Sequence, residues 1–538
     1  MSLESRATAL VLALVIASAC LLLAAETTVW DRDEARFAGQ AVEMGRSGQY
    51  LYPTLEGEIW LEYPVLVTWL MAMAISVLGP SAIAVRSCSV LATAATAYAT
   101  YLIGRRLVSP RVGLLAMLVV AFNPLMLVEG TAATADAVLI AFITCAMAGL
   151  VWRLTSTVAV WPAVLFGGAL AGALLTKGPV GLLPILVGAG VLWPRRNDRR
   201  SRAIAGEFGA AALVGLAVFC GWALLADRAA GGRLLSSRFL LEHVSRPVEG
   251  HGGNLLLWLP FYPAVAIVGL APWSPYLPAA LHRLWQGDER RPDLNRLLVW
   301  WIACPFVAFT VAVTKLPHYV LPAWPALAIA VAIAAAGAFD AQDDRNDASW
   351  LRGGVALAVI PAAVMLAALA AAQFLAHSPG LAWSLVPAEL AMVVMLPLIV
   401  TSLHRGRWHA ALAMTIAAAV LLPLVAAAGL SRVEALKPVP RLAATILSRA
   451  DSASTVATLG FDEPSLTFVL QRIPQRLRTV DEVNRWSEES GRGFLVTTRS
   501  LASQAAWPRR LIEIGASSGL NVVDGRTLEL VAFERPWR

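Results

Sequence analysis

Two adjoining stretches decide the fold: ATALVLALVIASACLLLAA, at residues 7–25, and WDRDEARFAGQAVEM, at residues 30–44. The first is long and apolar enough to cross a bilayer as a helix. The second places Asp33, Glu34 and Arg36 where that helix would leave the membrane. Ionisable side chains are costly beside hydrocarbon and often serve function there, although a solvated turn would carry the same charges. This junction is therefore the first candidate site.

Apolar stretches of the same kind recur along all 538 residues, and the mean hydropathy of +0.65 excludes an ordinary soluble globular protein. We predict an all-α polytopic membrane protein with about thirteen transmembrane helices. The first stretch lacks a small-residue cleavage site, so we expect a retained helix and not a signal peptide. The other candidate spans are residues 85–107, 111–128, 133–152, 160–175, 178–194, 207–226, 258–281, 296–313, 319–338, 353–374, 381–401 and 408–429.

The arginines orient these spans. Segment 64–78 is apolar but has only 15 residues, and Glu62 precedes it. If this segment lies in the interface, every Arg-rich loop falls on the cytoplasmic side, as the positive-inside rule requires; if it crosses, every one faces outward. We therefore expect the N-terminus inside, residues 26–84 as a first outside loop, and the C-terminus outside. The Arg-rich loops are residues 105–111, 195–202, 282–296, 340–352 and 404–407.

This orientation gathers both carboxylates and cations on the outer face. Each has an ordinary explanation, because a loop lysine commonly snorkels and a lone histidine is usually solvated or caps a helix. Together they contrast with the inside loops, which carry mostly arginine. The outward side chains are Asp33, Glu34, Asp136, Lys177, Arg238, Glu242, His243, Arg246, Lys315 and His318.

The character of the chain changes after about residue 430, where the long apolar runs stop. We predict a transmembrane domain at residues 1–430 and a small soluble α/β domain at residues 431–538, outside the membrane. The second domain has no GxGxxG, P-loop or metal-ligand spacing, so we expect it to be structural or to guide substrate. Its predicted elements are strands at 455–461, 493–498 and 527–533, helices at 481–489 and 501–506, and a turn at 521–525.

The cysteines and the net charge indicate no further chemistry. The 5 cysteines fall in or at the ends of apolar runs without CxxC spacing, which favours core thiols over metal ligands or disulfides. The net charge of +7 reflects Arg-rich loops between spans, and such loops report orientation and not nucleic-acid binding.

An ordered series of motifs follows the first span. It comprises Asp33-Glu34-Ala35-Arg36-Phe37-Ala38, Glu43-Met44, Pro53-Thr54-Leu55-Glu56-Gly57, Leu61-Glu62-Tyr63-Pro64, and further motifs at residues 134–136, 175–179 and 315–322. The series resembles the lipid A aminoarabinose transferases, which are protein O-mannosyltransferase-like, GT-C type glycosyltransferases. The resemblance covers essentially the whole chain. One position departs: that family typically has Glu-Lys-Pro-Pro where this chain has Glu62-Tyr63-Pro64-Val65, so a lysine that helps bind a lipid phosphate is absent.

The resemblance implies a glycosyltransferase of the bacterial inner membrane, with its active site and C-terminal domain facing the periplasm. Such an enzyme moves a sugar from a polyprenyl-phosphate-linked donor to lipid A, another glycolipid or a protein, with inversion at the anomeric carbon. Asp33 is the expected general base by its match to the family's loop aspartate, with Asp136 and then Glu34 as further catalytic candidates. The expected substrate-binding residues are Arg36, Glu62, Lys177, Arg238, Lys315, His318 and Tyr319.

Alternatives stay open for both the metal and the function class. A divalent metal could be held by oxygen and nitrogen ligands, but no close ligand spacing demands one. A polytopic transporter or lipid-linked-sugar flippase would also have many spans, yet transporters usually show inverted repeats and a midplane site, whereas these charges lie in loops. An inactive structural subunit is disfavoured by the full set of charged motifs. The candidate metal ligands are Asp33, Glu34, Asp136, His243 and His318.

Overall fold

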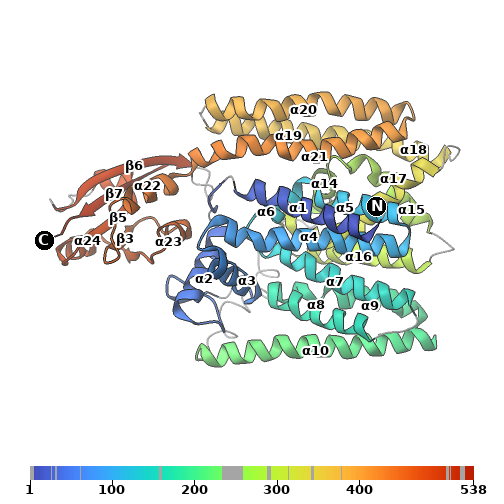
Figure 1. Ribbon diagram of the computed structural model, residues 1–538, viewed down its shortest axis with the longest axis horizontal. Helices are drawn as coiled ribbons and strands as arrows, with labels where there is room; N and C mark the ends of the chain where they lie inside the picture. The colour runs from blue at the N-terminus through green and yellow to red at the C-terminus, as the bar shows by residue number, and fades with distance from the viewer. Residues whose placement is uncertain are drawn as a thin grey trace.

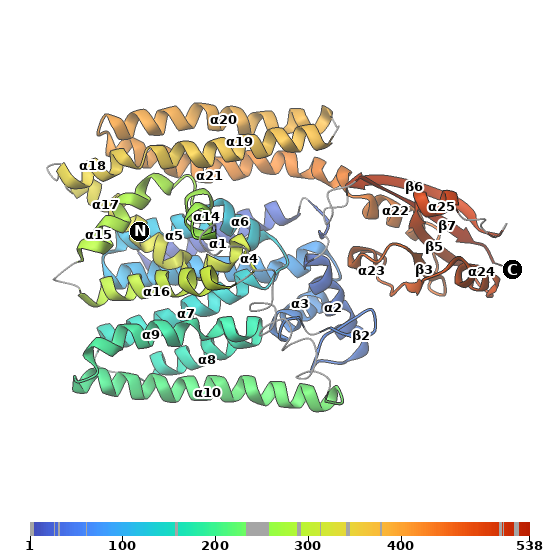
Figure 2. The same cartoon turned by 180° about the vertical axis from the view of Figure 1, so that it is seen from behind.

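The protein consists of a bundle of long helices and a smaller sheet-containing part that extends from one end of the bundle (Figure 1 and Figure 2). This arrangement confirms the predicted fold class of an all-α membrane protein with a small C-terminal α/β region. The computed structural model describes residues 5–25, 27–30, 33–60, 62–156, 160–232, 258–287, 292–312, 314–340, 345–376, 379–504, 508, 510–520 and 527–537.

The bundle helices are α1 Arg6–Ala25, α4 Ala82–Leu107, α5 Pro110–Ala121, α6 Pro124–Thr131, α7 Asp136–Thr155, α8 Trp161–Lys177, η1 Gly178–Leu182, α9 Leu183–Leu192, η2 Trp193–Arg195, α10 Arg199–Ala229, α14 Phe261–Gly269, η4 Ser274–Tyr276, α15 Leu277–Gln286, α16 Pro292–Val311, η5 Pro317–Ala323, α17 Trp324–Asp340, α18 Arg345–Gly353, α19 Ala356–Ala376, α20 Pro379–His404 and α21 Trp408–Val433. Between α1 and α4 the chain forms α2 Asp33–Ser47, β1 Thr54–Leu55, β2 Glu58–Ile59 and α3 Leu66–Leu78.

By length and composition, 9 helical segments of the described residues could cross a membrane, or 10 if α5 and α6 form one span bent by 66°. One of these segments, Trp161–Arg195, contains α8, η1 and α9. The sequence divided it into two spans, and the contacts agree. Lys177 at the end of α8 bonds Asp136 at the start of α7, whereas Arg200 at the start of α10 bonds Leu154 near the end of α7. The chain must therefore return through α9, antiparallel to α8.

The chain enters and leaves the first loop at the same end of the bundle. Arg86, in the first turns of α4, donates hydrogen bonds to the backbone oxygens of Ala24 and Thr27, both at 2.6 Å. The 13-residue helix α3 lies between these two points in the chain, so it does not carry the chain across the bundle. This agrees with the prediction that segment 64–78 does not cross. We call the end defined by Ala24 and Arg86 the loop end.

The arginine-rich connections meet at the opposite end. Arg106, at the end of α4, donates to Thr155 Oγ1 at 2.9 Å, and Arg153 pairs with Glu207 at 2.7 Å. Arg195 in η2 pairs with Asp293 at the start of α16. The described parts of several Arg-rich loops therefore share one end, as the sequence expected for a single side of the membrane.

Within the first loop, a buried glutamate fixes the β1–β2 hairpin to α2. Glu43 accepts hydrogen bonds from Thr54 Oγ1 at 2.9 Å, from the Gly57 N–H at 3.2 Å and from the Glu56 N–H. Glu56 and Gly57 have φ values of 57° and 82°, the positive pair that a tight two-residue hairpin turn requires. Burial raises the pKa of Glu43, and its hydrogen bonds oppose that shift. The loop is thus a packed structure and not a solvated connection.

The C-terminal part is a five-stranded mixed sheet in the order β4-β3-β5-β7-β6. β3 pairs in parallel with β4 and β5, and β7 pairs antiparallel with β5 and β6. Alternation along β5 buries Phe494 on one face of the sheet and Leu495 on the other. The elements are α22 Pro438–Leu447, β3 Thr455–Leu459, α23 Pro464–Leu470, β4 Gln475–Leu477, α24 Val480–Glu488, β5 Gly493–Thr498, α25 Arg499–Gln504, β6 Ile512–Leu520 and β7 Thr527–Arg535.

The predicted strands and helices of this part are found, while α22, α23, β4 and β6 were not anticipated. The predicted turn at 521–525 lies outside the described residues. Because α21 ends at Val433, we propose the domain boundary near residue 430, as the sequence suggested.

Candidate active site

A buried ion pair at the loop end forms the centre of the candidate site. Asp136 begins α7 and Lys177 ends α8, and the lysine Nζ lies 2.7 and 2.8 Å from the two carboxylate oxygens. Both residues are buried, with 7% and 6% of their surface exposed. The charges lie at favourable helix ends, since a carboxylate is stabilised at a helix N-terminus and a cation at a C-terminus. The antiparallel α7–α8 hairpin thus brings together two residues that the sequence placed in separate outside loops.

His318 connects this pair to a second carboxylate. Its Nε2 lies 3.9 Å from Asp136 Oδ2, and its Nδ1 lies 3.5 Å from Glu129 Oε1. Glu129, in α6, also accepts a hydrogen bond from Thr134 Oγ1 at 2.8 Å. Tyr319 follows His318, and its ring lies 5.5 Å from Lys177 Nζ, a cation–π distance. The sequence predicted His318 and Tyr319 as substrate-binding residues, whereas Glu129 was not among its candidates.

A second charged chain runs along the start of α2. Arg36 pairs with Asp33 one turn before it and also with Glu62, which follows the hairpin. Asp33 is the most exposed carboxylate of these, with 63% of its side chain exposed against 17% for Glu62. Asp33 also acts electrostatically on both Glu129 and His318. The two charged groups therefore form one cluster, with Asp33 at its open side.

Tyr63 lies between the two groups. Its ring is 5.5 Å from Lys177 Nζ and 5.4 Å from the ring of Phe37. Burial raises the pKa of Tyr63 to about 12, so the phenol keeps its proton at physiological pH. Tyr63 stands where the family that the sequence resembles has a lysine, so it brings a neutral hydrogen-bonding group to this position in place of a cation.

Glu34, the third catalytic candidate, is held in a structural contact. It is buried, and its two oxygens lie 2.8 and 2.7 Å from the guanidinium of Arg86. It also accepts the N–H groups of Trp30 at 2.8 Å and Ala133 at 2.6 Å. We therefore propose that Glu34 fixes the loop that leads to Asp136, in place of the catalytic role expected from sequence. The sequence analysis missed Arg86, although an arginine as the second residue of the predicted span 85–107 is an unusual feature that could have indicated it.

The remaining predicted cations have different outcomes. Lys315 donates to the backbone oxygens of Phe309 and Thr310 at 3.0 and 2.7 Å and to that of Ala312, so it caps the end of α16. The structure does not bring it to the Asp136 cluster through any contact of its ammonium group. Arg238, His243 and Arg246 lie outside the described residues.

Among the residues that the structure describes, no group of three or more His, Cys, Asp or Glu side chains is arranged to hold a metal ion. The candidate metal ligands named from the sequence also have different surroundings. Glu34 is bound to Arg86, and His243 lies outside the description.

The fold defines the class: this chain is a polytopic membrane protein with the GT-C type fold. Its structure superposes on ArnT from Cupriavidus metallidurans bound to undecaprenyl phosphate with a TM-score of 0.78, over 99% of this chain and 98% of that one, at 19% identity. The archaeal oligosaccharyltransferase AglB from Archaeoglobus fulgidus is more distant. Its TM-score is 0.51, over 92% of this chain and 70% of that one, at 13% identity.

Comparison with known sequences gives more specific matches than the fold does, and these matches confirm the resemblance inferred from the motifs. Residues 7–226 match the dolichyl-phosphate-mannose-protein mannosyltransferase family. One relative is the undecaprenyl phosphate-alpha-4-amino-4-deoxy-L-arabinose arabinosyl transferase from Pseudomonas aeruginosa UCBPP-PA14. It is 31% identical over an alignment that covers 56% of this chain and 54% of the relative. The corresponding transferase 2 of Proteus mirabilis is 28% identical over an alignment that covers 61% of this chain and 59% of the relative. The chain thus spans little more than half the length of these curated relatives.

Proposed function

We propose that the chain is an inner-membrane glycosyltransferase that moves a sugar from a polyprenyl-phosphate-linked donor to a lipid or other envelope acceptor at the periplasmic face. The observation that carries the proposal is the cluster of Asp33, Arg36, Asp136 and Lys177 at the loop end of the spans. The names of the relatives support a lipid-linked donor and a transferase activity. A flippase is less well supported, because transporters place their polar site near the membrane midplane.

The periplasmic orientation rests on charge. The described Arg-rich connections meet at the end opposite the cluster, and the positive-inside rule assigns that end to the cytoplasm. Labelling of single cysteines introduced at residues 105–111 tests this assignment. If an impermeant reagent added from the periplasm modifies these cysteines, the loop at residues 105–111 faces outward. The proposed orientation, and with it an outward-facing site, would then be refuted.

Lys177 is proposed to bind the donor phosphate through its remaining N–H. An ammonium group has three donors, and Asp136 accepts two of them. Tyr63 and Tyr319 flank it and present aromatic faces to the lysine. Because the described cluster holds more carboxylates than cations, a phosphate needs further positive charge, and Arg238 is the candidate from the sequence. Arg238→Ala should therefore raise the KM for donor.

Asp33 is proposed as the general base for a hydroxyl acceptor. The acceptor oxygen attacks the anomeric carbon, the bond from that carbon to the phosphate oxygen breaks, and polyprenyl phosphate leaves with the bonding electrons. The proton of the hydroxyl passes to Asp33, and the configuration inverts. A phosphate acceptor is already ionised, so in that case Asp33 and Asp136 would position Arg36 and the sugar.

The test is transfer by the purified protein in liposomes that contain a radiolabelled polyprenyl-phosphate sugar and lipid A. We expect label in lipid A and release of polyprenyl phosphate. A chain that only moves the labelled lipid between leaflets, without product, would establish the flippase alternative. Mass spectrometry of envelope lipids and glycoproteins, with and without the chain, then identifies the natural sugar and acceptor.

A further inference from the structure

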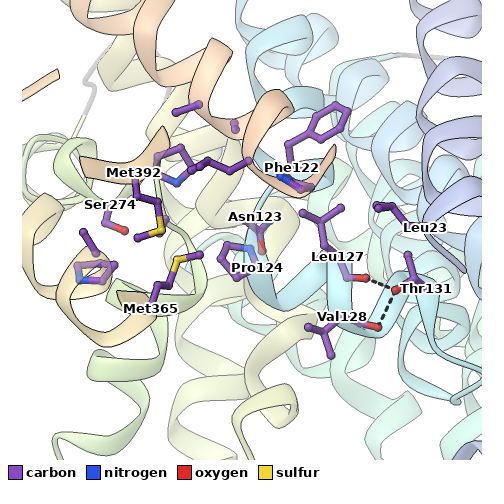
Figure 3. Close-up of a pocket in the computed structure, with 18 of the residues that line it drawn as sticks. Leu23, Phe122, Asn123, Pro124, Leu127, Val128, Thr131, Ser274, Met365 and Met392 are labelled. Atoms are coloured by element: carbon purple, nitrogen blue, oxygen red, sulfur yellow. Dashed lines mark hydrogen bonds between the residues drawn. The ribbon is translucent and has the colours of Figure 1, made fainter. Parts of the chain in front are cut away.

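The helix α6 has two faces with different chemistry. Leu127, Val128 and Thr131 line an apolar cavity of about 460 Å³ (Figure 3). Thr131 donates its hydroxyl to the backbone oxygen of Leu127, so this polar group is used within the helix. Glu129 is rotated by about 200° from Leu127 and lies on the other face. This carboxylate is only 8% exposed, and the proposed reaction has so far given it no role.

The packing of α6 directs Glu129 toward the charged cluster. Gly130, next in the chain, lies so close to α4 that a Cβ there would be 2.4 Å from Thr93 Oγ1. A larger residue would push α6 away from α4, so this approach requires glycine. Thr134, in the loop before α7, donates its hydroxyl to Glu129 Oε2 at 2.8 Å. The other carboxylate oxygen, Oε1, faces His318.

His318 lies between two carboxylates. Its Nδ1 is 3.5 Å from Glu129 Oε1, and its Nε2 is 3.9 Å from Asp136 Oδ2. A ring nitrogen without a proton would turn its lone pair toward a carboxylate oxygen, which is repulsive. Each of the two gaps therefore needs one proton.

The contact at Nδ1 decides what Nε2 can do. If the imidazole carries two protons, both of its nitrogens donate to carboxylates. If the imidazole is neutral, a protonated Glu129 donates to Nδ1 and leaves the ring proton on Nε2. In both forms the Nε2 proton points toward Asp136. Glu129 therefore selects the form of His318 that can donate to Asp136.

We propose that Glu129 is a positioning residue for the transfer reaction, which orients His318 so that His318 and Lys177 together hold the Asp136 carboxylate. The inference rests on the proposed transferase function, in which Asp136 belongs to the cluster that carries transfer. Contacts between catalytic groups are often long and tighten only in the substrate complex or the transition state. Misplacement of a reacting group by about 1 Å can cost on the order of 10²-fold in rate, so we expect Glu129 to act on the rate.

Transfer kinetics in liposomes with labelled donor and lipid A test the inference. Glu129→Leu removes the carboxylate at similar volume, and kcat should fall at least about tenfold. The KM for donor should stay within about twofold, because Lys177 keeps both of its bonds to Asp136. The matched control is Thr134→Val, which removes the hydroxyl that also bonds Glu129 and should change kcat less than about twofold. An unchanged kcat in folded Glu129→Leu, or an equal fall in Thr134→Val, would overturn the assignment.

A double-variant cycle with His318→Gln separates action through His318 from a role in the packing of α6. In the His318→Gln protein, Glu129→Leu should lower kcat by less than about a further twofold, because residues of one network do not act additively. Single effects that multiply in the double variant would show that Glu129 acts without His318 and would overturn the inference. If Glu129→Leu does not fold, Glu129→Ala takes its place in the same cycle.

NMR of the full chain with 15N-labelled histidine gives a readout that does not need turnover. The chain has 7 histidines, and the signals lost in His318→Gln identify those of His318. Glu129→Leu should shift the ring nitrogen signals of His318, whereas Thr134→Val should leave them in place. Unshifted His318 signals in Glu129→Leu would overturn the contact. The expected shift in a protein that transfers no sugar would refute the proposed function alone.

Discussion

The buried pair of Glu34 and Arg86 offers the sharpest test of how the site is held. Arg86→Gln removes two charge-assisted hydrogen bonds to Glu34 at 2.8 and 2.7 Å. It also removes donors from the carbonyls of Ala24, Thr27 and Thr28 at 2.6, 2.6 and 2.9 Å. Loss of one partner leaves the other charge buried, which typically costs about 3–5 kcal/mol. We expect the free energy of unfolding to fall by at least about 3 kcal/mol.

The assay is equilibrium unfolding in mixed micelles with an increasing fraction of dodecyl sulfate. The matched control is Arg202→Gln, because Arg202 is an exposed residue of α10; it should change stability by less than about 0.5 kcal/mol. The double variant Glu34→Gln, Arg86→Gln places two neutral amides in the same space. It should lose less than the sum of the single changes, with a coupling of about 0.5–3 kcal/mol. An Arg86→Gln protein within about 1 kcal/mol of the wild type would refute the structural role of the pair.

Three further predictions follow from individual contacts. Lys177→Ala should raise the KM for the lipid-linked donor and lower the transfer rate, and unchanged donor kinetics would show that Lys177 only pairs with Asp136. Lys315→Met should leave the KM for donor within twofold of the wild-type value, because the ammonium group of Lys315 caps α16. A tenfold rise of this KM in donor titrations would indicate that Lys315 binds the donor phosphate after all. Lys437→Met removes an ammonium 4.0 Å from the Trp30 ring and 3.2 Å from Glu434, so limited proteolysis should cut between the bundle and the sheet sooner than in the wild type. Proteolysis at the wild-type rate would show that this contact does not hold the C-terminal part.

The sequence located most of the long helices, because membrane helices must satisfy their backbone hydrogen bonds internally, which leaves long apolar runs. The positive-inside rule, applied to the Arg-rich loops, also predicted that segment 64–78 does not cross the membrane. The hydrogen bond from Arg86 to the backbone oxygen of Ala24 agrees with this prediction. The sequence predicted about thirteen spans, whereas 9 segments of the described residues, or 10 with the bent pair α5 and α6, are long and apolar enough to cross a membrane. Segment 258–281 forms the shorter pieces α14, η4 and α15, which a hydropathy window cannot separate from one crossing helix.

The site was only partly predictable, because charge type and loop position do not specify partners. Asp136, Lys177, His318 and Tyr319 do lie together. Glu34 and Lys315 carry the same charges as the proposed site residues, but Glu34 is bound to the internal Arg86 and Lys315 to a helix end. Adjacent helical residues point in different directions, which is why Asp33 faces Arg36 while Glu34 faces Arg86.

The attachment of the C-terminal part could not be predicted either, because its contacts join residues about 400 positions apart. Glu434 accepts the N–H of Thr28 at 3.0 Å, and Thr467 donates to Glu56 at 3.4 Å. Arg46 of α2 also donates to the backbone oxygen of Gln471. We propose that the C-terminal part holds the first loop in place, so it acts on the site through Thr28 and Trp30 and not through residues of its own.

The most direct test of the account is the transfer rate of Asp33→Asn in liposomes with saturating donor and acceptor. The substitution keeps the shape of the side chain and removes the negative charge from the open side of the cluster. We predict a folded protein whose transfer rate falls at least about a hundredfold, the low end for a lost acid–base group. Asp136→Asn should lose less, and Glu34→Gln less again. Near-normal transfer by a well-folded Asp33→Asn protein would contradict the mechanism and move the central role to Asp136.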